Sequence, residues 1–264
     1  MNQPARLDFS LDREIVIRAP RPTVFRYFTD AARFALWWGA GSSIVPAVGG
    51  AVTIVYPGGT RASGEVLEIV PNERIAFSYG YDSADSALPP GGSRVTITLR
   101  DDPHGTRLHL RHELGDQGQR DHHVQGWRYH LAVFANVVAG EVHTKTAAAL
   151  ADAWFSAWND ADPAERRRTF AAITTADVAH HDAYSCNRGR DDLDAHVTAS
   201  KVHMPGIAIE RAGEPRQCQG CALVDWVAKA PTGARVGAGV NLFEFSADGK
   251  IARVVGFMAN LTPA

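Results

Sequence analysis

The amino-acid sequence predicts an α+β protein with two domains, each of which closes a sheet and helices around an apolar pocket. The chain has 264 residues, a length that suits two ordinary domains. Its hydrophobic content of 45% and charged content of 21% are those of a globular protein. The order of strands and helices in residues 1–141 differs from the order in residues 142–264, so we place the domain boundary between these two segments.

Charge and cysteine usage narrow the function classes. The net charge of −2 gives no long-range attraction to nucleic acid or to an anionic membrane, so we expect neither as a partner. We interpret the run Arg166–Arg168 as a solvated helix face. Three cysteines cannot form an even disulfide framework, and residues 1–8 lack the apolar core of a signal peptide. We therefore expect a cytoplasmic protein.

The first domain is predicted as a strand, two short helices, a series of antiparallel strands and a long closing helix. Leu11, Ile15 and Ile17 share one face of the first strand, residues 11–18. The other expected elements are helices at 22–29 and ending at 37–38, strands at 52–56, 61–70, 74–81, 94–100 and 106–114, and a helix at 121–139. Gly140 suits the position just after that helix. Such a sheet curls around the helix and leaves a cavity between them.

Side-chain direction selects the residues that would line this first cavity. His123, Trp127, His130 and Phe134 form one stripe of the closing helix, and His112 points inward from its strand. The lining candidates are Trp37, Tyr79, His112, Trp127 and His130. The alternative is that the histidines are satisfied core or rim groups. Neighbouring residues of a helix diverge by about 100°, so His122 and His123 cannot share one metal ion.

Several spaced motifs in this half resemble one known superfamily. They are Ala19-Pro20, Trp37-Trp38, Gly49-Gly50, Gly64-Glu65-Val66, Pro71-Asn72-Glu73-Arg74, Gly105-Thr106 before His112, and Gly126-Trp127. This set is similar to the START-like SRPBCC superfamily, and within it to the branch named after the activator of heat-shock protein 90 ATPase. The resemblance covers about residues 10–140. It implies a helix-grip fold with a hydrophobic-ligand pocket and, as an alternative, a chaperone-associated stress role.

The second domain is predicted as three helices followed by a bent sheet. Asp162-Pro163-Ala164-Glu165 carries the signals of a helix start. The expected helices are 142–159, 163–172 and 189–202, and the expected strands are 178–184, 207–211, 218–230, 234–246 and 251–258. Cys218 and Cys221 fall within a predicted strand, so we interpret them as small strand residues and expect no metal.

This half resembles the SnoaL-like, nuclear-transport-factor-2-like superfamily. The residues that carry the resemblance are Ala157-Trp158-Asn159 before Asp162-Pro163, His181-Asp182 before Gly189-Arg190, Asp248-Gly249-Lys250-Ile251 and Gly256-Phe257. The resemblance covers about residues 144–260 and implies a cone-shaped α+β domain that works without a cofactor. It also implies a homodimer that forms through the open face of the sheet.

The resemblance further implies a candidate catalytic set. In ketosteroid-isomerase-like members a strand aspartate is the general base, and a tyrosine and a protonated aspartic acid form the oxyanion hole. Asp182 matches the base, whereas Trp154 and Asn241 stand at the tyrosine and acid positions. Both replacements still carry an N–H donor.

Strand alternation adds the expected ligand-binding residues of the second pocket. His180, Asp182 and Tyr184 share one face of their strand. Trp226 and Phe243 are placed on the pocket side of the long strands. The alternative role of Asp182 is structural, as a turn cap or as a partner of Arg190. We expect His196 and His203 at the surface or rim.

Three hypotheses of function follow. The first is binding of a small hydrophobic or aromatic molecule in one or both pockets, without a cofactor. The second is a cofactor-independent isomerase, cyclase or hydratase in the second domain, with Asp182 as general base. The third is a structural role, in which the second half supplies a dimer interface.

Overall fold

The computed structural model describes residues 6–259 and confirms the predicted α+β class with two sheets. The chain forms two compact units, which divide between Val138 and Ala139. Among residues 6–259, every helix is either too short or too polar to cross a membrane.

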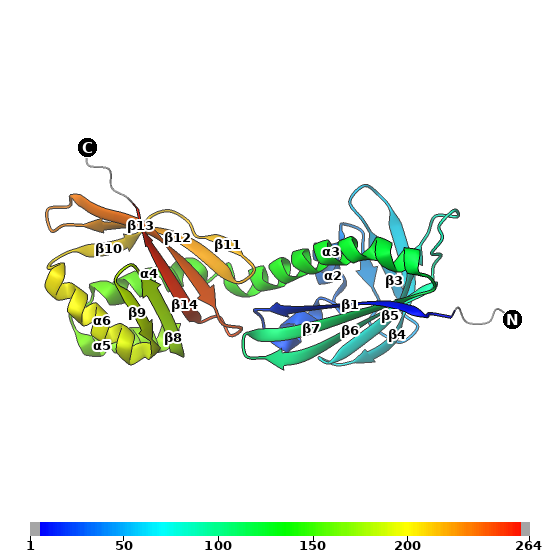
Figure 1. Cartoon of the computed structure of the whole chain (residues 1–264), viewed down its shortest axis with the longest axis horizontal. Coiled ribbons are helices and arrows are strands. Elements are labelled where there is room, and N and C mark those ends of the chain that lie inside the picture. Colours follow the sequence, from blue (N-terminus) through cyan, green and yellow to red (C-terminus); the bar gives the residue numbers. More distant parts are fainter. Residues whose placement is uncertain (1–5, 260–264) are drawn as a thin grey trace. The chain divides into compact units, whose positions relative to one another are not determined.

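The first unit is an antiparallel sheet with three helices (Figure 1). Its elements are β1 (Phe9–Ile17), α1 (Arg21–Arg26), α2 (Ala31–Trp38), β2 (Ser43–Ile44), β3 (Ala51–Val55), β4 (Arg61–Val70), β5 (Arg74–Tyr81), β6 (Ser93–Asp102), β7 (Gly105–Leu114) and α3 (Gln117–His143). The seven strands follow the order β1-β7-β6-β5-β4-β3-β2, so the first strand pairs with the last. Asp30 caps α2 by accepting a hydrogen bond from Arg33 N at 2.9 Å. The apolar stripe of α3, which includes Trp127, Leu131 and Phe134, is buried.

The closing helix α3 is longer than predicted at both ends. It begins at Gln117 rather than at 121 and continues to His143, so Gly140 lies inside the helix rather than just after it. Gly140 does not take the positive φ of a helix-ending glycine. A glycine inside a helix costs only about 1 kcal/mol, which the packing of a long helix overrides. The next helix, predicted from Val142, begins at Ala147.

The second unit has three helices on one side of a second sheet (Figure 1). Its elements are α4 (Ala147–Asn159), α5 (Pro163–Ile173), β8 (Thr174–Asp182), β9 (Ser185–Arg188), α6 (Gly189–His203), β10 (Ala208–Arg211), β11 (Arg216–Cys218), β12 (Cys221–Lys229), β13 (Arg235–Phe245) and β14 (Ile251–Met258). The strand order is β10-β12-β13-β14-β8-β9, and β11 pairs with β12. Among the strands described within residues 6–259, only β14 and β8 pair in parallel. Asp162 caps α5 as predicted, by accepting from Ala164 N at 2.8 Å.

Two strand predictions in this unit are wrong. Strand β8 ends at Asp182, so Tyr184 lies in the turn before β9 rather than on the strand. The predicted strand 218–230 is split by a hairpin turn at Gln219 and Gly220, both with positive φ. Two-residue hairpins require that conformation, and a glycine at the second position supplies it.

Candidate functional site

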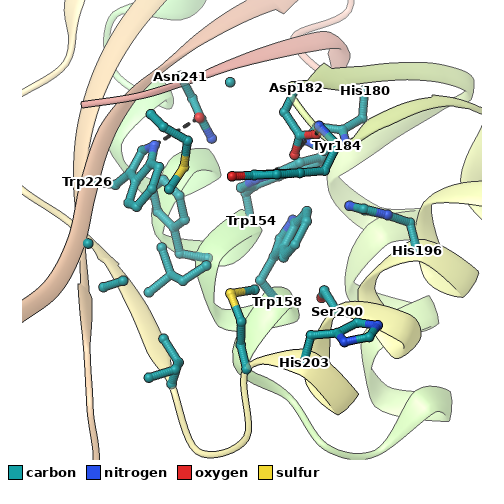
Figure 2. A pocket seen from close by; sticks show the side chains of 18 of the residues that line it. Trp154, Trp158, His180, Asp182, Tyr184, His196, Ser200, His203, Trp226 and Asn241 are labelled. Carbon is teal, nitrogen blue, oxygen red and sulfur yellow. Dashed lines mark hydrogen bonds and ion pairs between the residues drawn. The ribbon is translucent and has the colours of Figure 1, made fainter. Parts of the chain in front are cut away.

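The second unit contains a cavity of about 670 Å³ between the helices and the sheet (Figure 2). Pockets that hold small molecules measure roughly 300–1,000 Å³, so the volume suits such a ligand. Most of the wall is aromatic or aliphatic. The lining residues are Trp154, Phe155, Trp158, His180, Asp182, Tyr184, His196, Ala199, Ser200, His203, Met204, Ile207, Ile209, Trp226, Ala228, Val236, Gly237, Asn241, Gly256 and Met258.

Asp182 lies at the end of β8 and has two roles there. Its Oδ1 accepts hydrogen bonds from Tyr184 N and from Ser185 Oγ, both at 2.8 Å, and so holds the turn into β9. Its Oδ2 lies 3.7 Å from His180 Nε2, on the cavity wall. Arg190, the alternative partner considered for Asp182, donates instead to Thr174. One oxygen of the carboxylate therefore holds the turn, and the other is available to a group in the cavity.

His180 is buried beside Asp182 and faces two other aromatic rings. Its side chain contacts Trp154 and Trp158, with ring centroids 5.7 and 5.4 Å away. Burial lowers the pKa of His180 to about 4, although the Asp182 carboxylate acts in the opposite direction. The imidazole is therefore neutral at physiological pH.

Helix α6 forms the wall next to Asp182 and carries a polar stripe. His196, Ser200 and His203 occupy one face of the helix and line the cavity (Figure 2). His196 was predicted at the surface or rim, but its ring lies 5.7 Å from that of His180 and 5.6 Å from Trp158. The i, i+4, i+7 spacing of these three residues was a signal for a shared face that sequence reasoning missed.

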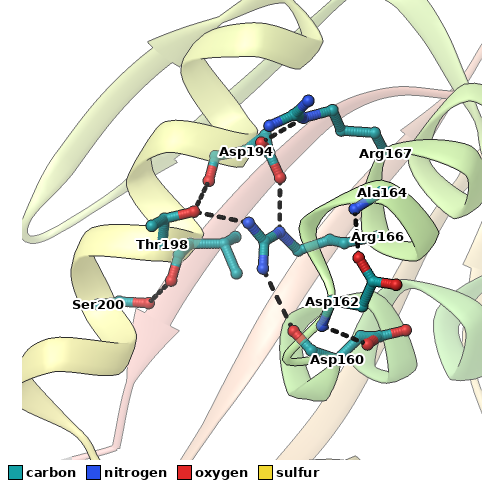
Figure 3. A network of polar contacts seen from close by, with 9 residues as sticks. Asp160, Asp162, Ala164, Arg166, Arg167, Asp194, Thr198 and Ser200 are labelled. Carbon is teal, nitrogen blue, oxygen red and sulfur yellow. Dashed lines mark hydrogen bonds and ion pairs between the residues drawn. The ribbon is translucent and has the colours of Figure 1, made fainter.

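A buried ion pair fixes α6 to α5 (Figure 3). The Arg166 side chain is 1% exposed, and it donates to Asp194 Oδ1 and to Thr198 Oγ1, both at 2.6 Å. Arg167 donates to the other oxygen of Asp194 at 2.8 Å. The prediction of a solvated arginine run is therefore wrong for Arg166. It faces α6 because Asp194 offers the charge that makes its burial possible.

Asn241 and Trp226 form the wall across from α6. Trp226 Nε1 donates to Asn241 Oδ1 at 3.0 Å. The amide nitrogen of Asn241 can therefore donate to a ligand in the cavity. Two glycines make this arrangement possible. A Cβ at Gly239 would lie 2.5 Å from the Trp226 ring, and one at Gly256 would lie 3.2 Å from Asn241 Oδ1 and 3.4 Å from the Cβ of Asp182. Asp182 and Asn241 therefore flank Gly256.

The other residues predicted for this pocket lie at different depths. Trp154 is 1% exposed and lines the inner wall, and Phe243 packs behind it rather than on the cavity surface. Tyr184 is 81% exposed and lines the mouth from its turn. Six of the seven predicted residues thus meet at one cavity, namely Trp154, His180, Asp182, Tyr184, Trp226 and Asn241. Trp158, His196, Ser200 and Met204 are lining residues that the prediction did not include.

The corresponding space in the first unit is filled by aromatic side chains. Phe134 stacks on Phe28 with centroids 4.9 Å apart and meets Trp37 edge-on at 4.9 Å. A cavity of only about 90 Å³ is left, lined by Trp38, Tyr56, Tyr79, Tyr81, His122, His123, Gly126, Trp127 and His130. A more open depression of about 880 Å³ shares Tyr81, His122 and His123 with this cavity, and the rest of its lining is mainly polar.

The five residues predicted to line a pocket in the first unit are all buried, and three of them line the small cavity. Tyr79, Trp127 and His130 line the small cavity, but Trp37 and His112 do not. His112 is fully buried, with Nδ1 accepting from Trp127 Nε1 at 3.0 Å and Nε2 2.8 Å from Ser93 Oγ. Burial lowers the pKa of His112 to about 3. Both ring nitrogens are satisfied, which agrees with the alternative role considered for this histidine.

Several solved structures each resemble about half of this chain. A SnoaL-like structure from Agrobacterium tumefaciens, described as a candidate isomerase, is 24% identical and covers 42% of this chain and 96% of its own, with a TM-score of 0.41. An AHSA1-like protein from Rhizobium etli is 32% identical and covers 53% and 88%, with a TM-score of 0.43. The Aha1 dimer from Colwellia psychrerythraea is 18% identical and covers 47% and 90%, with a TM-score of 0.41.

A comparison with curated proteins gives no match. The family of activator of Hsp90 ATPase homolog 1-like proteins matches residues 18–139. The likeness expected for residues 18–139 is thus confirmed by the match to the activator of Hsp90 ATPase homolog 1-like family. A SnoaL-like structure is among the solved structures that this chain resembles.

Proposed function

We propose that the second unit binds a small, largely apolar molecule in its 670 Å³ cavity. The observation that carries this proposal is the contrast between an aromatic wall and a few polar groups that converge on it. Trp154, Trp158 and Trp226 provide flat apolar surface, which suits a ring system. The small cavity between helix and sheet of the first unit measures about 90 Å³, which is too small for such a molecule.

The polar groups define which functional groups the ligand carries. Asn241 offers an N–H donor, because Trp226 occupies its oxygen. Asp182 offers a carboxylate oxygen, because Tyr184 and Ser185 occupy only its Oδ1. A ring with a carbonyl that accepts from Asn241 and a hydroxyl that donates to Asp182 would satisfy both residues. The proposed ligand class is therefore a hydroxylated or keto-substituted aromatic or alicyclic compound.

A flat aromatic alcohol provides the test. Titration with 2-naphthol, followed by tryptophan fluorescence, is expected to show saturable binding to the full chain. Ser200→Trp fills the cavity from α6 and is expected to weaken binding at least about tenfold, which corresponds to about 1.4 kcal/mol. Ala195→Trp, at an exposed position of the same helix, is the control. Equal affinities for the two variants would contradict the proposal, and native mass spectrometry of fresh protein would reveal the natural ligand.

The second candidate function is cofactor-independent proton transfer of the isomerase, cyclase or hydratase type. It is favoured by the placement of Asp182 and Asn241 on either side of Gly256, with Trp154 nearby. A carboxylate can take a proton from a carbon of a ligand in the cavity while an N–H donor of the same cavity stabilises the enolate oxygen. Asp182 would be the base, and Asn241 and Trp154 the donors.

A generic proton-abstraction substrate tests this candidate without the natural one. In 5-nitrobenzisoxazole, removal of the C3 proton breaks the N–O bond and releases 2-cyano-4-nitrophenolate, which absorbs visible light. Asp182→Asn is expected to remove the catalysed rate, and Asp177→Asn, an exposed position of the same strand, is expected to keep it. Equal rates for both variants would rule out Asp182 as the base.

Two further roles stay proposals. A homodimer through the second unit is supported by exposed apolar side chains on the outer sheet face, among them Leu223 and Phe257. Light scattering of the full chain, with Phe257→Lys as the disrupting variant, tests it.

A chaperone-associated role is supported only by the family matched at residues 18–139. Stimulation of a chaperone ATPase would demonstrate that role, and we expect none.

A further inference from the structure

Three side chains of different chemistry meet on one wall of the second unit's cavity. His180 and Asp182 come from β8, and His196 comes from α6. One possible ligand atom from each residue lies within 4.8 Å of the ligand atoms of the other two. Figure 2 shows the three side chains on the same side of the cavity. All three residues line the space that a ligand would enter, so the group is accessible without unfolding.

The contacts around Asp182 fix one carboxylate oxygen and leave the other free. Oδ1 accepts from Tyr184 N and Ser185 Oγ at 2.8 Å. Oδ2 faces His180 Nε2 at 3.7 Å, which is longer than a hydrogen bond. Two ligands of one metal ion are separated by about this distance, because each bond measures about 2.0–2.2 Å. The gap is therefore suited to an ion rather than to a direct contact.

His180 Nδ1 has neighbours of the kind that orient histidines in metal sites. Its Nδ1 lies 3.3 Å from Ser185 Oγ and 3.2 Å from the side-chain amide of Asn187. Ser185 gives its hydroxyl proton to Asp182, so its oxygen can accept from Nδ1–H. The Asn187 amide can be turned so that its oxygen also accepts. This tautomer leaves the Nε2 lone pair facing Asp182, and such outer contacts orient histidine ligands in metal sites.

We propose that His180, Asp182 and His196 bind a divalent transition-metal ion of the zinc type, with its remaining coordination positions open to the cavity. Two imidazoles and one carboxylate form the donor set that zinc and neighbouring first-row ions prefer. Magnesium and calcium prefer oxygen donors and are poorly matched by two imidazoles. Arg166 holds the histidine-bearing helix in place through Asp194. A bound ion would make Asp182 a metal ligand, so this inference competes with the second candidate function and with the proposed hydrogen bond from a ligand hydroxyl to Asp182. It leaves the binding of a largely apolar molecule in the cavity as proposed.

Cobalt(II) is a visible probe for this site. The full chain, freed of metal by chelation, is titrated with Co²⁺ and then with Zn²⁺. We expect one ion per chain, visible absorption bands of a low-coordinate Co²⁺ site, and loss of those bands as Zn²⁺ displaces the cobalt. His196→Ala is expected to weaken binding at least about tenfold, because a three-ligand site loses one ligand. His196 is only half-buried, so the fold should persist in this variant, and circular dichroism checks it.

A matched variant excludes chance binding by surface histidines. His203→Ala removes a second histidine of the same helix that also lines the cavity but lies outside the group of three. It is expected to keep the wild-type affinity. Equal weakening by both variants, no change with either, or no binding by wild-type protein would each overturn the inference. Binding of 2-naphthol is measured on the same metal-free protein, so a failed metal site and a failed ligand site give different results.

Discussion

The two units use similar side chains at the space between helix and sheet, but only one of them leaves that space open. In the first unit, Phe134 is fully buried and packs against Tyr27, Phe28 and Trp37. In the second unit, Phe155 meets Phe243 on one side and the 670 Å³ cavity on the other. Phenylalanine is therefore a core residue in the first unit and part of a cavity wall in the second.

The polar groups of the two units differ in the same way. His112 uses both ring nitrogens within the first unit, through Trp127 and Ser93. In the second unit, Asp182 and Asn241 each commit only part of their hydrogen-bonding capacity to the fold. A satisfied polar group stabilises its own fold, whereas a partly satisfied group at a cavity can bind something else. Function is therefore to be sought in the second unit.

Truncating one phenylalanine in each unit gives the largest expected contrast. Phe134→Ala should lower the free energy of unfolding by about 4 kcal/mol, because it opens a void in a filled aromatic cluster. Phe155→Ala should cost roughly half as much, because the cavity already removes neighbours on one side. Urea unfolding of the full chain measures both values. A larger loss for Phe155→Ala would mean that the cavity is not an open space in solution.

The ion pair behind the cavity gives the next largest effect. Arg166→Met should cost about 3 kcal/mol, because it leaves the buried Asp194 with only the exposed Arg167. Arg168→Met is the control, since Arg168 is exposed and pairs with Glu165, which is also exposed. The control should change stability by less than about 0.5 kcal/mol. The same variants show whether α6 positions the cavity wall, because Arg166→Met should also weaken 2-naphthol binding.

Local sequence patterns predicted most of the fold, and the exceptions have physical causes. Apolar periodicity located the helix stripe with Trp127 and Phe134, and the Asp162-Pro163 signal located the start of α5. The extension of α3 through Gly140 was missed because tertiary packing overrides the intrinsic preference of one glycine. The Gln219-Gly220 hairpin was missed because flanking residues that favour strand concealed the turn.

The site was predicted less completely, because a cavity forms where side chains from several elements leave space unfilled. Strand alternation brought His180, Asp182 and Trp226 to one cavity, but it could not show that Phe243 lies behind Trp154. The burial of Arg166 depends on Asp194, which is 28 residues away along the chain. Whether aromatic rings fill a pocket or line it depends on volumes from several elements, and no local pattern encodes this.

Acid should destabilise the first unit through its buried histidine. The pKa of His112 is lowered by burial to about 3, with His123 as a neighbouring histidine that lowers it further. In the unfolded chain this imidazole takes up a proton near its ordinary pKa of about 6.5. Stability is therefore complete above that pH and falls as the pH drops toward 3, by about 2 kcal/mol at pH 5. Urea midpoints from pH 8 to pH 5 measure the slope. His112→Gln should reduce the slope, and an unchanged slope would assign the effect to other groups.

The smallest expected effect separates two of the three tryptophans that line the cavity. Trp226→Phe removes the donor to Asn241 Oδ1 and should cost about 1 kcal/mol, the net contribution of one hydrogen bond. It also frees the Asn241 amide to turn, so 2-naphthol should bind less tightly by a factor below about ten. Trp158→Phe is the matched control, because residues 6–259 offer no hydrogen-bond partner to its indole nitrogen. Urea midpoints and fluorescence titration measure both variants. If Trp158→Phe weakened binding more than Trp226→Phe, ring contact rather than the orientation of Asn241 would determine how the cavity holds its ligand.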